Sequence, residues 1–377
     1  MSAQAISRGI LVLGLGFAAG MQLGKIAPLI GRMQAEFGFS LTFIGWLASL
    51  LGLFVALAAY PATRFVARRG TARSLKAGAV AMIAGAIALG LSRSAELMIV
   101  SRGIEAIGYV LLVIAAPANL ATHSPSHLRG VFLALWGGFV PIGYALANLQ
   151  AAALPEEWPS SWVMLTFAFP IALSSVLMAV TLPTEMDTGA KAAKRRPIPL
   201  IGWVLATAFG LYVYLSIGFF TFLPEYRASH SAGDVMFPAA VALCVPLGNV
   251  LAAILLRGSG ASRARPLALI GFISAGVAAA MLYSSWPLDA IVMPLFALAG
   301  GMTASGLFAQ VPRLAANETA AASIIGAMAQ AGGLSTLLEP PLAGFLAETY
   351  GWAALGWSLT TVALTGAALN ILFHAAR

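Results

Sequence analysis

The chain has 377 residues, of which 60% are hydrophobic and only 9% are charged, and its mean hydropathy is +0.90. Soluble domains contain about 25% charged residues, so this composition excludes a soluble fold. Apolar runs of roughly 20 residues recur along the chain, and each is long enough to cross a bilayer as a helix. We therefore predict an all-α membrane protein embedded in the lipid bilayer.

Twelve apolar runs predict twelve transmembrane helices. They cover residues 9–30, 41–62, 75–92, 97–121, 130–153, 162–182, 199–223, 235–256, 266–284, 290–311, 323–346 and 352–373. A polar, charged and proline-flanked stretch in the middle of the chain has the composition of a linker. We expect an N-terminal six-helix bundle over 1–182, a cytoplasmic linker over 183–198 and a C-terminal six-helix bundle over 199–377.

The first span combines small residues with two polar side chains. Gly16, Gly20 and Gly24 recur every four residues, a spacing that favours the close approach of another helix. Gln22 and Lys25 are three residues apart and share a helix face. A bare ammonium in hydrocarbon is costly, so Lys25 either reaches the membrane surface along its apolar stem or binds a group inside the membrane.

The fourth span carries the sequence RGIEAIG. Arg102 and Glu105 are three residues apart and can pair on one helix face, which Tyr109 continues. Two interpretations stay open: the pair is architectural, or Arg102 joins Lys25 in attracting an anion. The Glu105 carboxyl group is a candidate for carrying a coupling proton.

Later spans add further candidates. Trp136 and Pro141 belong to the sequence LWGGFVPIG, whose glycines and proline predict a kink in the fifth span. Tyr212 of the seventh span is a candidate substrate contact. In the eleventh span Glu339 precedes a proline pair that begins at Pro340, whose missing amide bends the helix. We take Glu339 as a second candidate for proton coupling.

Basic residues indicate how the chain is oriented. With the N-terminus placed in the cytoplasm, 16 of the 21 Lys and Arg residues fall on the cytoplasmic side and 3 on the outer side. Short cytoplasmic loops are enriched in Lys and Arg, so we predict a cytoplasmic (inner) membrane protein with both termini in the cytoplasm. This asymmetry also explains the net charge of +8 without a nucleic-acid partner.

No cluster of His and Cys in the sequence predicts a metal site, and no P-loop predicts ATP binding. The single Cys244 cannot form an intramolecular disulfide. We therefore expect no metal, no cofactor and no enzymatic activity.

Two six-span halves and a basic central loop resemble the major facilitator superfamily of secondary transporters. The loop after the second span, TRFVARRGTAR, is similar to that superfamily's basic loop at Arg68, Gly70 and Arg73, whereas Ala67 replaces its usual aspartate. The runs GKIAPLIGRMQAEFGFSLTFIGWLASL and GGLSTLLEPPLAG resemble the cyanate/nitroimidazole transporter family within it. The resemblance implies a monomer in which spans 1 and 4 line a central cavity.

We expect a secondary active transporter that moves a small solute, in our interpretation a small anion or carboxylate, by rocker-switch alternating access with proton coupling as a hypothesis. Candidate substrate-binding residues are Lys25, Arg102, Gln22, Tyr109, Tyr212 and Trp136. Candidate gating or hinge residues are Arg68, Gly70, Arg73, Pro141 and Pro340. Two rivals stay open: a proton-coupled exporter of drugs or metabolites with the same fold, and a non-transporting membrane receptor or scaffold.

Overall fold

The computed structural model describes residues 2–181, 198–230, 236–256, 262–283, 288–314 and 318–372, and its regular elements in these ranges are all helical. In chain order they are α1 (Ser2–Gly24), η1 (Ala27–Leu29), α2 (Ile30–Phe37), α3 (Leu41–Arg69), α4 (Thr71–Leu91), α5 (Ala95–His123), α6 (Ser126–Gly137), α7 (Phe139–Ala152), α8 (Ser160–Thr166), α9 (Ala168–Thr181), α10 (Leu200–His230), α11 (Met236–Leu256), α12 (Ala264–Leu282), α13 (Asp289–Phe308), α14 (Val311–Leu314), α15 (Glu318–Tyr350) and α16 (Trp352–Leu372). The all-α prediction is confirmed.

Ten segments of the described chain are long and apolar enough to cross a membrane, and each coincides with one of the predicted spans. The predicted span at 130–153 falls on α6 and α7, and the one at 323–346 falls on α15. Nearly all of the predicted linker, residues 183–197, lies outside the described residues. The chain is an integral membrane protein of helical spans.

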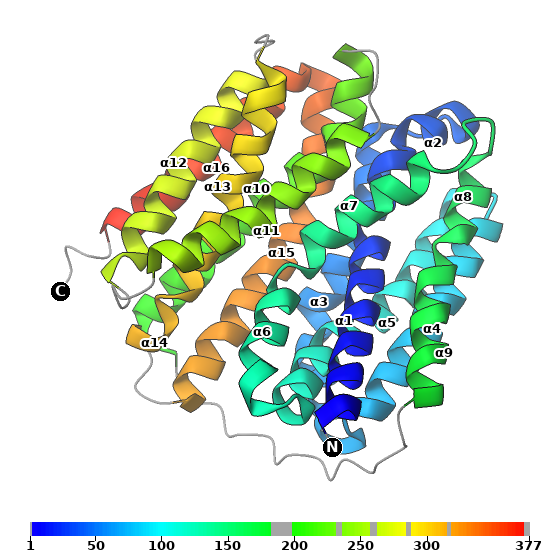
Figure 1. The fold of residues 1–377 in the computed structure, drawn as a ribbon. Helices are drawn as coiled ribbons and strands as arrows, with labels where there is room; N and C mark the ends of the chain where they lie inside the picture. The colour runs from blue at the N-terminus through cyan, green and yellow to red at the C-terminus, as the bar shows by residue number, and fades with distance from the viewer. Residues whose placement is uncertain are drawn as a thin grey trace. The chain divides into compact units, whose positions relative to one another are not determined.

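The chain divides into two compact units, and α3 contributes to both. Unit 1 holds Met1–Phe39 and Leu53–Ala192, and unit 2 holds Ser40–Gly52 and Ala193–Arg377. Within unit 1, α1 packs against α5, α7 and α9, while α4 packs along α5 (Figure 1). Within unit 2, α10 packs against α15 and α16, and α12 packs against α13 and α16.

Three predicted spans are interrupted, which corrects the expectation of continuous helices at 9–30, 130–153 and 162–182. The interruptions lie between α1 and η1, between α6 and α7, and between α8 and α9. The last helical residues before them are Gly24, Gly137 and Thr166, and Pro28, Pro141 and Pro170 each follow by four positions. A proline has no amide hydrogen for the carbonyl four residues earlier, so the helix ends at that carbonyl.

Pro141 therefore acts differently from the predicted kink inside a span. It is the third residue of α7, where its missing amide costs no intrahelical hydrogen bond. The break lies at Gly138, between α6 and α7.

Close packing along α1 follows its glycines, as predicted. The Trp136 ring lies over Gly16, the Phe139 carbonyl lies beside Gly20, and Tyr144 lies against Gly24. A Cβ atom at Gly20 would lie 2.4 Å from the Phe139 carbonyl oxygen. The glycines therefore bring the backbones of α1 and α7 together.

Candidate functional site

Four polar side chains form a buried charged cluster in unit 1: Gln22, Lys25, Arg102 and Glu105. Each of them is 0% exposed. Gln22 is in the last turn of α1 and Lys25 is in the turn that follows it, while Arg102 and Glu105 are on α5. The structure thus joins the polar residues of the first and fourth predicted spans, and Lys25 does not reach the membrane surface.

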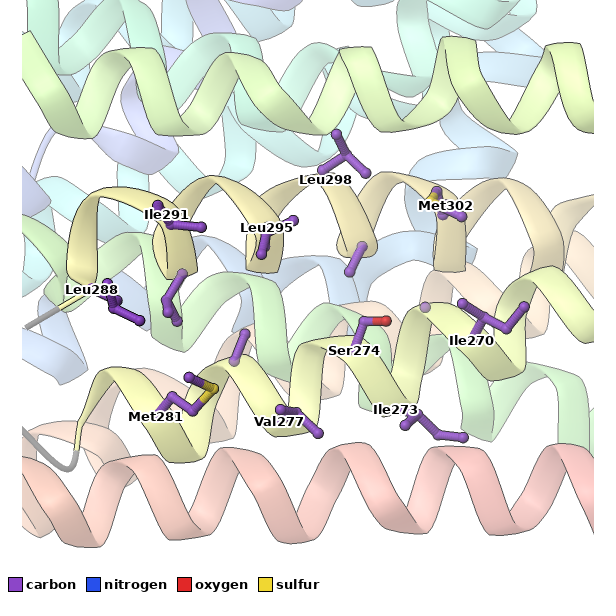
Figure 2. A pocket seen from close by; sticks show the side chains of 14 residues that line it. Ile270, Ile273, Ser274, Val277, Met281, Leu288, Ile291, Leu295, Leu298 and Met302 are labelled. Atoms are coloured by element: carbon purple, nitrogen blue, oxygen red, sulfur yellow. The ribbon is translucent and has the colours of Figure 1, made fainter. Parts of the chain in front are cut away.

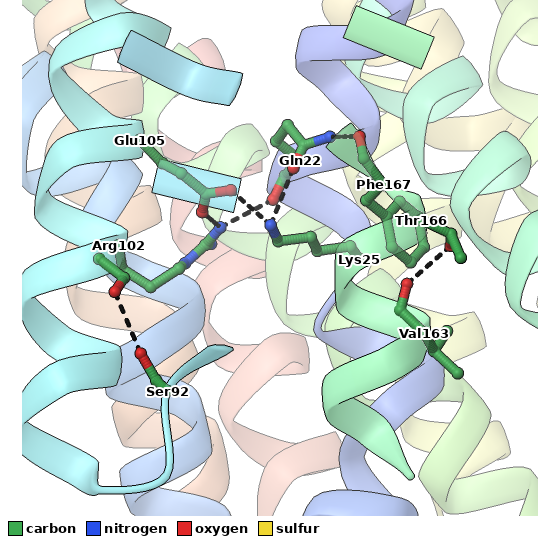
Figure 3. Close-up of polar contacts among 9 residues, drawn as sticks. Gln22, Lys25, Ser92, Arg102, Glu105, Val163, Thr166 and Phe167 are labelled. Carbon is green, nitrogen blue, oxygen red and sulfur yellow. Dashed lines mark hydrogen bonds and ion pairs between the residues drawn. The ribbon is translucent and has the colours of Figure 1, made fainter. Parts of the chain in front are cut away.

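The Glu105 carboxylate pairs with both cations of the charged cluster, Lys25 and Arg102 (Figure 3). Lys25 Nζ donates to Oε1 of Glu105 and, over 2.8 Å, to Oε1 of Gln22. The Arg102 guanidinium donates to the other carboxylate oxygen, Oε2, over 2.7 Å. The Glu105 carboxylate therefore makes an ion pair through each of its oxygens.

Helix ends supply the remaining acceptors. Gln22 lies among the last four residues of α1, whose carbonyls lack intrahelical partners, and Arg102 donates to its carbonyl oxygen over 3.0 Å. The Gln22 side-chain amide donates to the carbonyl of Phe167, between α8 and α9, over 2.7 Å. The cluster therefore lies where two of the interrupted spans meet. Cations beside the carboxyl end of α1 also match the negative end of its dipole.

A glycine on α4 makes room for the carboxylate. A Cβ atom at Gly85 would lie 2.5 Å from Cγ of Glu105. One turn before Glu105 on α5, the Ser101 hydroxyl contacts the hydroxyl of Ser92, the residue that follows α4, at an oxygen–oxygen distance of 3.2 Å. The α4 and α5 helices therefore hold the carboxylate in one position.

The charges of the cluster do not cancel. Lys25 and Arg102 supply two positive charges and Glu105 supplies one negative charge, so the ionised cluster has a net charge of +1 inside the membrane-spanning region. Buried charges need compensation, because desolvation of an ion costs several kcal/mol.

Unit 1 holds two other residues that we predicted as substrate contacts. One lies near the charged cluster, and the other packs between helices. Tyr109 is buried on α5, within electrostatic range of Arg102 and Tyr144. Trp136 is buried against Gly16 and stacks on Phe139 with ring centroids 4.6 Å apart. In this conformation Trp136 joins α6 to α1 and α7.

The two predicted candidates of unit 2 lie on different helices. Tyr212 on α10 packs its ring 5.6 Å from that of Phe209 and hydrogen bonds to Ser216. Glu339 on α15 is 0% exposed, and neither carboxylate oxygen has a hydrogen-bond partner among the described residues. The two glutamates that we predicted as proton carriers therefore have opposite surroundings.

Three of the five predicted gating or hinge residues, Arg68, Gly70 and Arg73, lie at the junction of α3 and α4. Gly70 has φ +82°, a backbone conformation that favours glycine, and it separates the two helices. Arg68 and Arg73 are exposed on either side of it. The last turns of α3 also form a groove of about 380 Å³ that is lined by Pro61, Arg64, Phe65, Arg68 and Arg69.

A second groove lies between α12 and α13 and has a volume of about 400 Å³ (Figure 2). Ser274 is the single polar side chain among its lining residues, and Ile291, Leu295 and Val277 are each more than half exposed. Exposed apolar side chains on membrane-spanning helices face lipid. This groove does not fit a charged solute.

Two parts of the charged cluster were not predicted from the sequence. The carbonyl of Phe167 accepts from Gln22, and Gly85 gives space to Glu105. Pro170 was the available signal for a free carbonyl near Phe167, since it ends α8. Gly85 offered no signal, because its role depends on which helix lies beside α4.

An all-helical membrane protein that buries charged side chains among its spans has the construction of a solute transporter. The chain belongs to the Major Facilitator Superfamily, whose family model matches residues 12–338. This family assignment points to a transporter rather than an enzyme.

Two relatives that the chain matches are named as transport proteins. The chain is 26% identical to the arabinose-proton symporter of Escherichia coli (strain K12) over 182 residues, which are 48% of this chain and 38% of the symporter. It is 22% identical to the uncharacterized transporter YycB of Bacillus subtilis (strain 168) over 355 residues, which cover 90% of this chain and 87% of YycB. The chain spans well under half the length of the symporter that it matches.

A crystal structure of a POT family transporter in complex with a thioalcohol conjugated peptide superposes with a TM-score of 0.78. The alignment covers 98% of this chain and 96% of that one at 14% identity. At 14% identity this likeness supports the fold alone.

Proposed function

We propose that this protein is a secondary active transporter of a small anion or carboxylate that works by rocker-switch alternating access with proton coupling. The observation that carries the proposal is the sharing of one carboxylate, Glu105, by two fully buried cations, Lys25 and Arg102. A net positive charge buried in a membrane protein is costly, and an anionic solute would offset that cost when it binds.

Lys25 is the residue through which we expect the solute to bind. Its ammonium group has three hydrogens, and the structure gives it two acceptors, Gln22 and Glu105. An anion that approaches the third hydrogen would gain a charge-assisted hydrogen bond. Tyr109 and Gln22 would supply hydrogen bonds beside it, and Arg102 would hold Glu105 in place.

Two similarities favour particular parts of this proposal, namely proton coupling and a small solute. One relative is named a proton symporter, which favours proton coupling here. The resemblance to the cyanate/nitroimidazole transporter family favours a small solute. We also infer twelve crossings in two six-helix bundles, a cytoplasmic membrane location with both termini in the cytoplasm, and function as a monomer.

A second candidate is an exporter of cationic compounds. The buried carboxyl group of Glu339, which no described residue neutralises, favours it. In that case a cation would bind in unit 2, and the charged cluster of unit 1 would be architectural.

A thermal-shift screen of the purified protein tests the first candidate against the second. The probes are acetate, benzoate, nitrate and the cation tetraphenylphosphonium. A ligand at 100 times its Kd stabilises the folded state by about 2.7 kcal/mol, which raises the melting temperature. We expect at least one anion to raise the melting temperature of the wild type and of Lys76→Met, an exposed lysine on α4, but not that of Lys25→Met.

Two results would argue against the anion site. If an anion stabilises Lys25→Met as much as the wild type, Lys25 does not bind it. If tetraphenylphosphonium stabilises all three proteins and no anion does, the exporter becomes the better description.

A further inference from the structure

Glu105 and Glu339, the glutamates buried among the described residues, differ in what surrounds them. Glu105 contacts two cations, each of which donates a hydrogen bond to it. Glu339 is as fully buried, yet both of its carboxylate oxygens lack a hydrogen-bond partner within the described part of the chain. A difference in proton occupancy follows from this contrast.

The Glu339 carboxyl group rests against bare backbone of α10. A Cβ atom at Gly218 would lie 1.7 Å from Oε1 of Glu339, so only glycine leaves room for the group there. Gly45 on the first part of α3 lies beside the next residue, with its Cβ position 2.3 Å from the Pro340 carbonyl oxygen. Two helices of unit 2 therefore enclose this turn of α15.

The ionisable groups that face Glu339 are tyrosines. Tyr214 on α10 and Tyr283 after α12 lie within electrostatic range of its carboxyl group. The Tyr214 hydroxyl is bonded to Ser358 of α16, and the buried Tyr283 hydroxyl has no hydrogen-bond partner among the described residues. Two further surfaces beside α15, Ser40–Gly52 and α16, contain no ionisable side chain. The short helix α14 also packs on α15 and carries Arg313, which does not hydrogen bond to Glu339.

No described Lys, Arg or His thus supplies a positive charge to Glu339. A carboxylate ion in an apolar interior is very costly without a cation or hydrogen-bond donors, and the neutral acid avoids most of that cost. Glu105 has the reverse situation, because losing its charge would leave two buried cations without a counter-ion.

We propose that Glu339 is the proton-binding residue of this transporter and holds a proton in the conformation described, whereas Glu105 is the counter-ion of Lys25 and Arg102. A proton from water forms an O–H bond with a Glu339 oxygen, and the same bond breaks when the proton returns to water. The assignment of a coupling role to this proton rests on the proposed function; the assignment of the proton to Glu339 does not.

The two prolines next to Glu339 leave backbone carbonyls to which water can hydrogen bond. Pro340 and Pro341 have no amide hydrogens for the carbonyls of Thr336 and Leu337, so α15 lacks two of its backbone hydrogen bonds beside Glu339. Those carbonyls can accept from water when the surroundings of α15 open.

Infrared spectroscopy of the purified protein tests the proposal without a substrate. A protonated carboxylic acid has a carbonyl-stretch band that is distinct from carboxylate bands and shifts in D2O. We expect this band in the wild type at pH 7, its loss in Glu339→Gln, and its persistence in Glu348→Gln, which removes an exposed carboxyl group from the same helix. Glu105→Gln, if it folds, should also keep the band.

Three outcomes would overturn the assignment: no such band in the wild type, a band that Glu339→Gln leaves unchanged, or a wild-type band that sodium chloride abolishes and choline chloride does not. The last result would make Glu339 a sodium site. Failure of every anion in the thermal-shift screen would leave the infrared result unaffected, so the two proposals can fail separately.

Discussion

Glu105 and Glu339 show how the partners of a side chain decide its role inside a membrane protein. Both are fully buried, Glu105 on α5 and Glu339 on α15. Glu105 holds Lys25 and Arg102 in one cluster, whereas Glu339 lies against Gly218 with two tyrosines in range. The first surroundings stabilise a charge and the second stabilise a neutral acid.

At the scale of single residues, substitutions within the charged cluster should differ sharply in how much they lower the free energy of unfolding. Glu105→Gln leaves two cations buried without a counter-ion, and we expect it to lower the free energy of unfolding by about 3–5 kcal/mol. Lys25→Met leaves the neutral Arg102–Glu105 pair and one unpaired amide oxygen, so about 1–3 kcal/mol is expected. Denaturation in detergent micelles measures both.

The control for Glu105→Gln is Glu96→Gln, which removes an exposed carboxyl group from the first turn of the same helix. It should cost less than about 1 kcal/mol, the usual size of an exposed helix-dipole effect. If Lys25→Met proves more destabilising than Glu105→Gln, the cluster does not carry the excess positive charge that we assign to it.

At the scale of helices, a proline shows where a membrane span can be interrupted, but not every proline interrupts its span. Pro28, Pro141 and Pro170 each follow the end of a helix by four positions. Pro117 and Pro294, however, lie inside continuous helices. At two of the interruptions another helix supplies a donor to a carbonyl close to the break: Arg102 donates to the carbonyl of Gln22, and the Gln22 side chain donates to the carbonyl of Phe167.

The glycine contact between α1 and α7 leads to a prediction at the same scale. Gly20→Ala places a methyl group 2.4 Å from a backbone oxygen that cannot move aside, so we expect a loss of about 1–3 kcal/mol in the free energy of unfolding. Gly103→Ala on α5 has no atom within 4 Å of its new methyl group and should be neutral or stabilising by up to about 1 kcal/mol.

Denaturation of the two alanine variants beside the wild type checks this pair. Equal stability of Gly20→Ala and Gly103→Ala would mean that the backbones of α1 and α7 are not as close as the structure shows.

At the scale of the whole molecule, the distribution of Lys and Arg predicts the orientation in the membrane. A green fluorescent protein fused after Arg377 should fluoresce, because it folds in the cytoplasm, and alkaline phosphatase fused there should be inactive. Alkaline phosphatase inserted between Arg93 and Ser94, in the turn between α4 and α5, should be active. The reverse pattern at these two positions would contradict the cytoplasmic termini.

Much of the fold was predictable from the sequence, because lipid imposes one strong requirement. A helix that crosses hydrocarbon must be long, apolar and internally hydrogen-bonded, so hydropathy alone located the helices and indicated a membrane protein. The pairing of Arg102 with Glu105 also followed from a spacing of three residues on one helix.

Only the tertiary structure decided which buried charges meet. Spacing within a helix says nothing of which helix lies opposite, so the Lys25–Glu105 ion pair, the Phe167 carbonyl and the space left by Gly85 depend on packing. The same holds for Glu339, which the sequence offered beside Glu105 as a candidate for proton coupling. Its lack of a cation is a property of its neighbours, and the free energy of a buried charge depends on those neighbours.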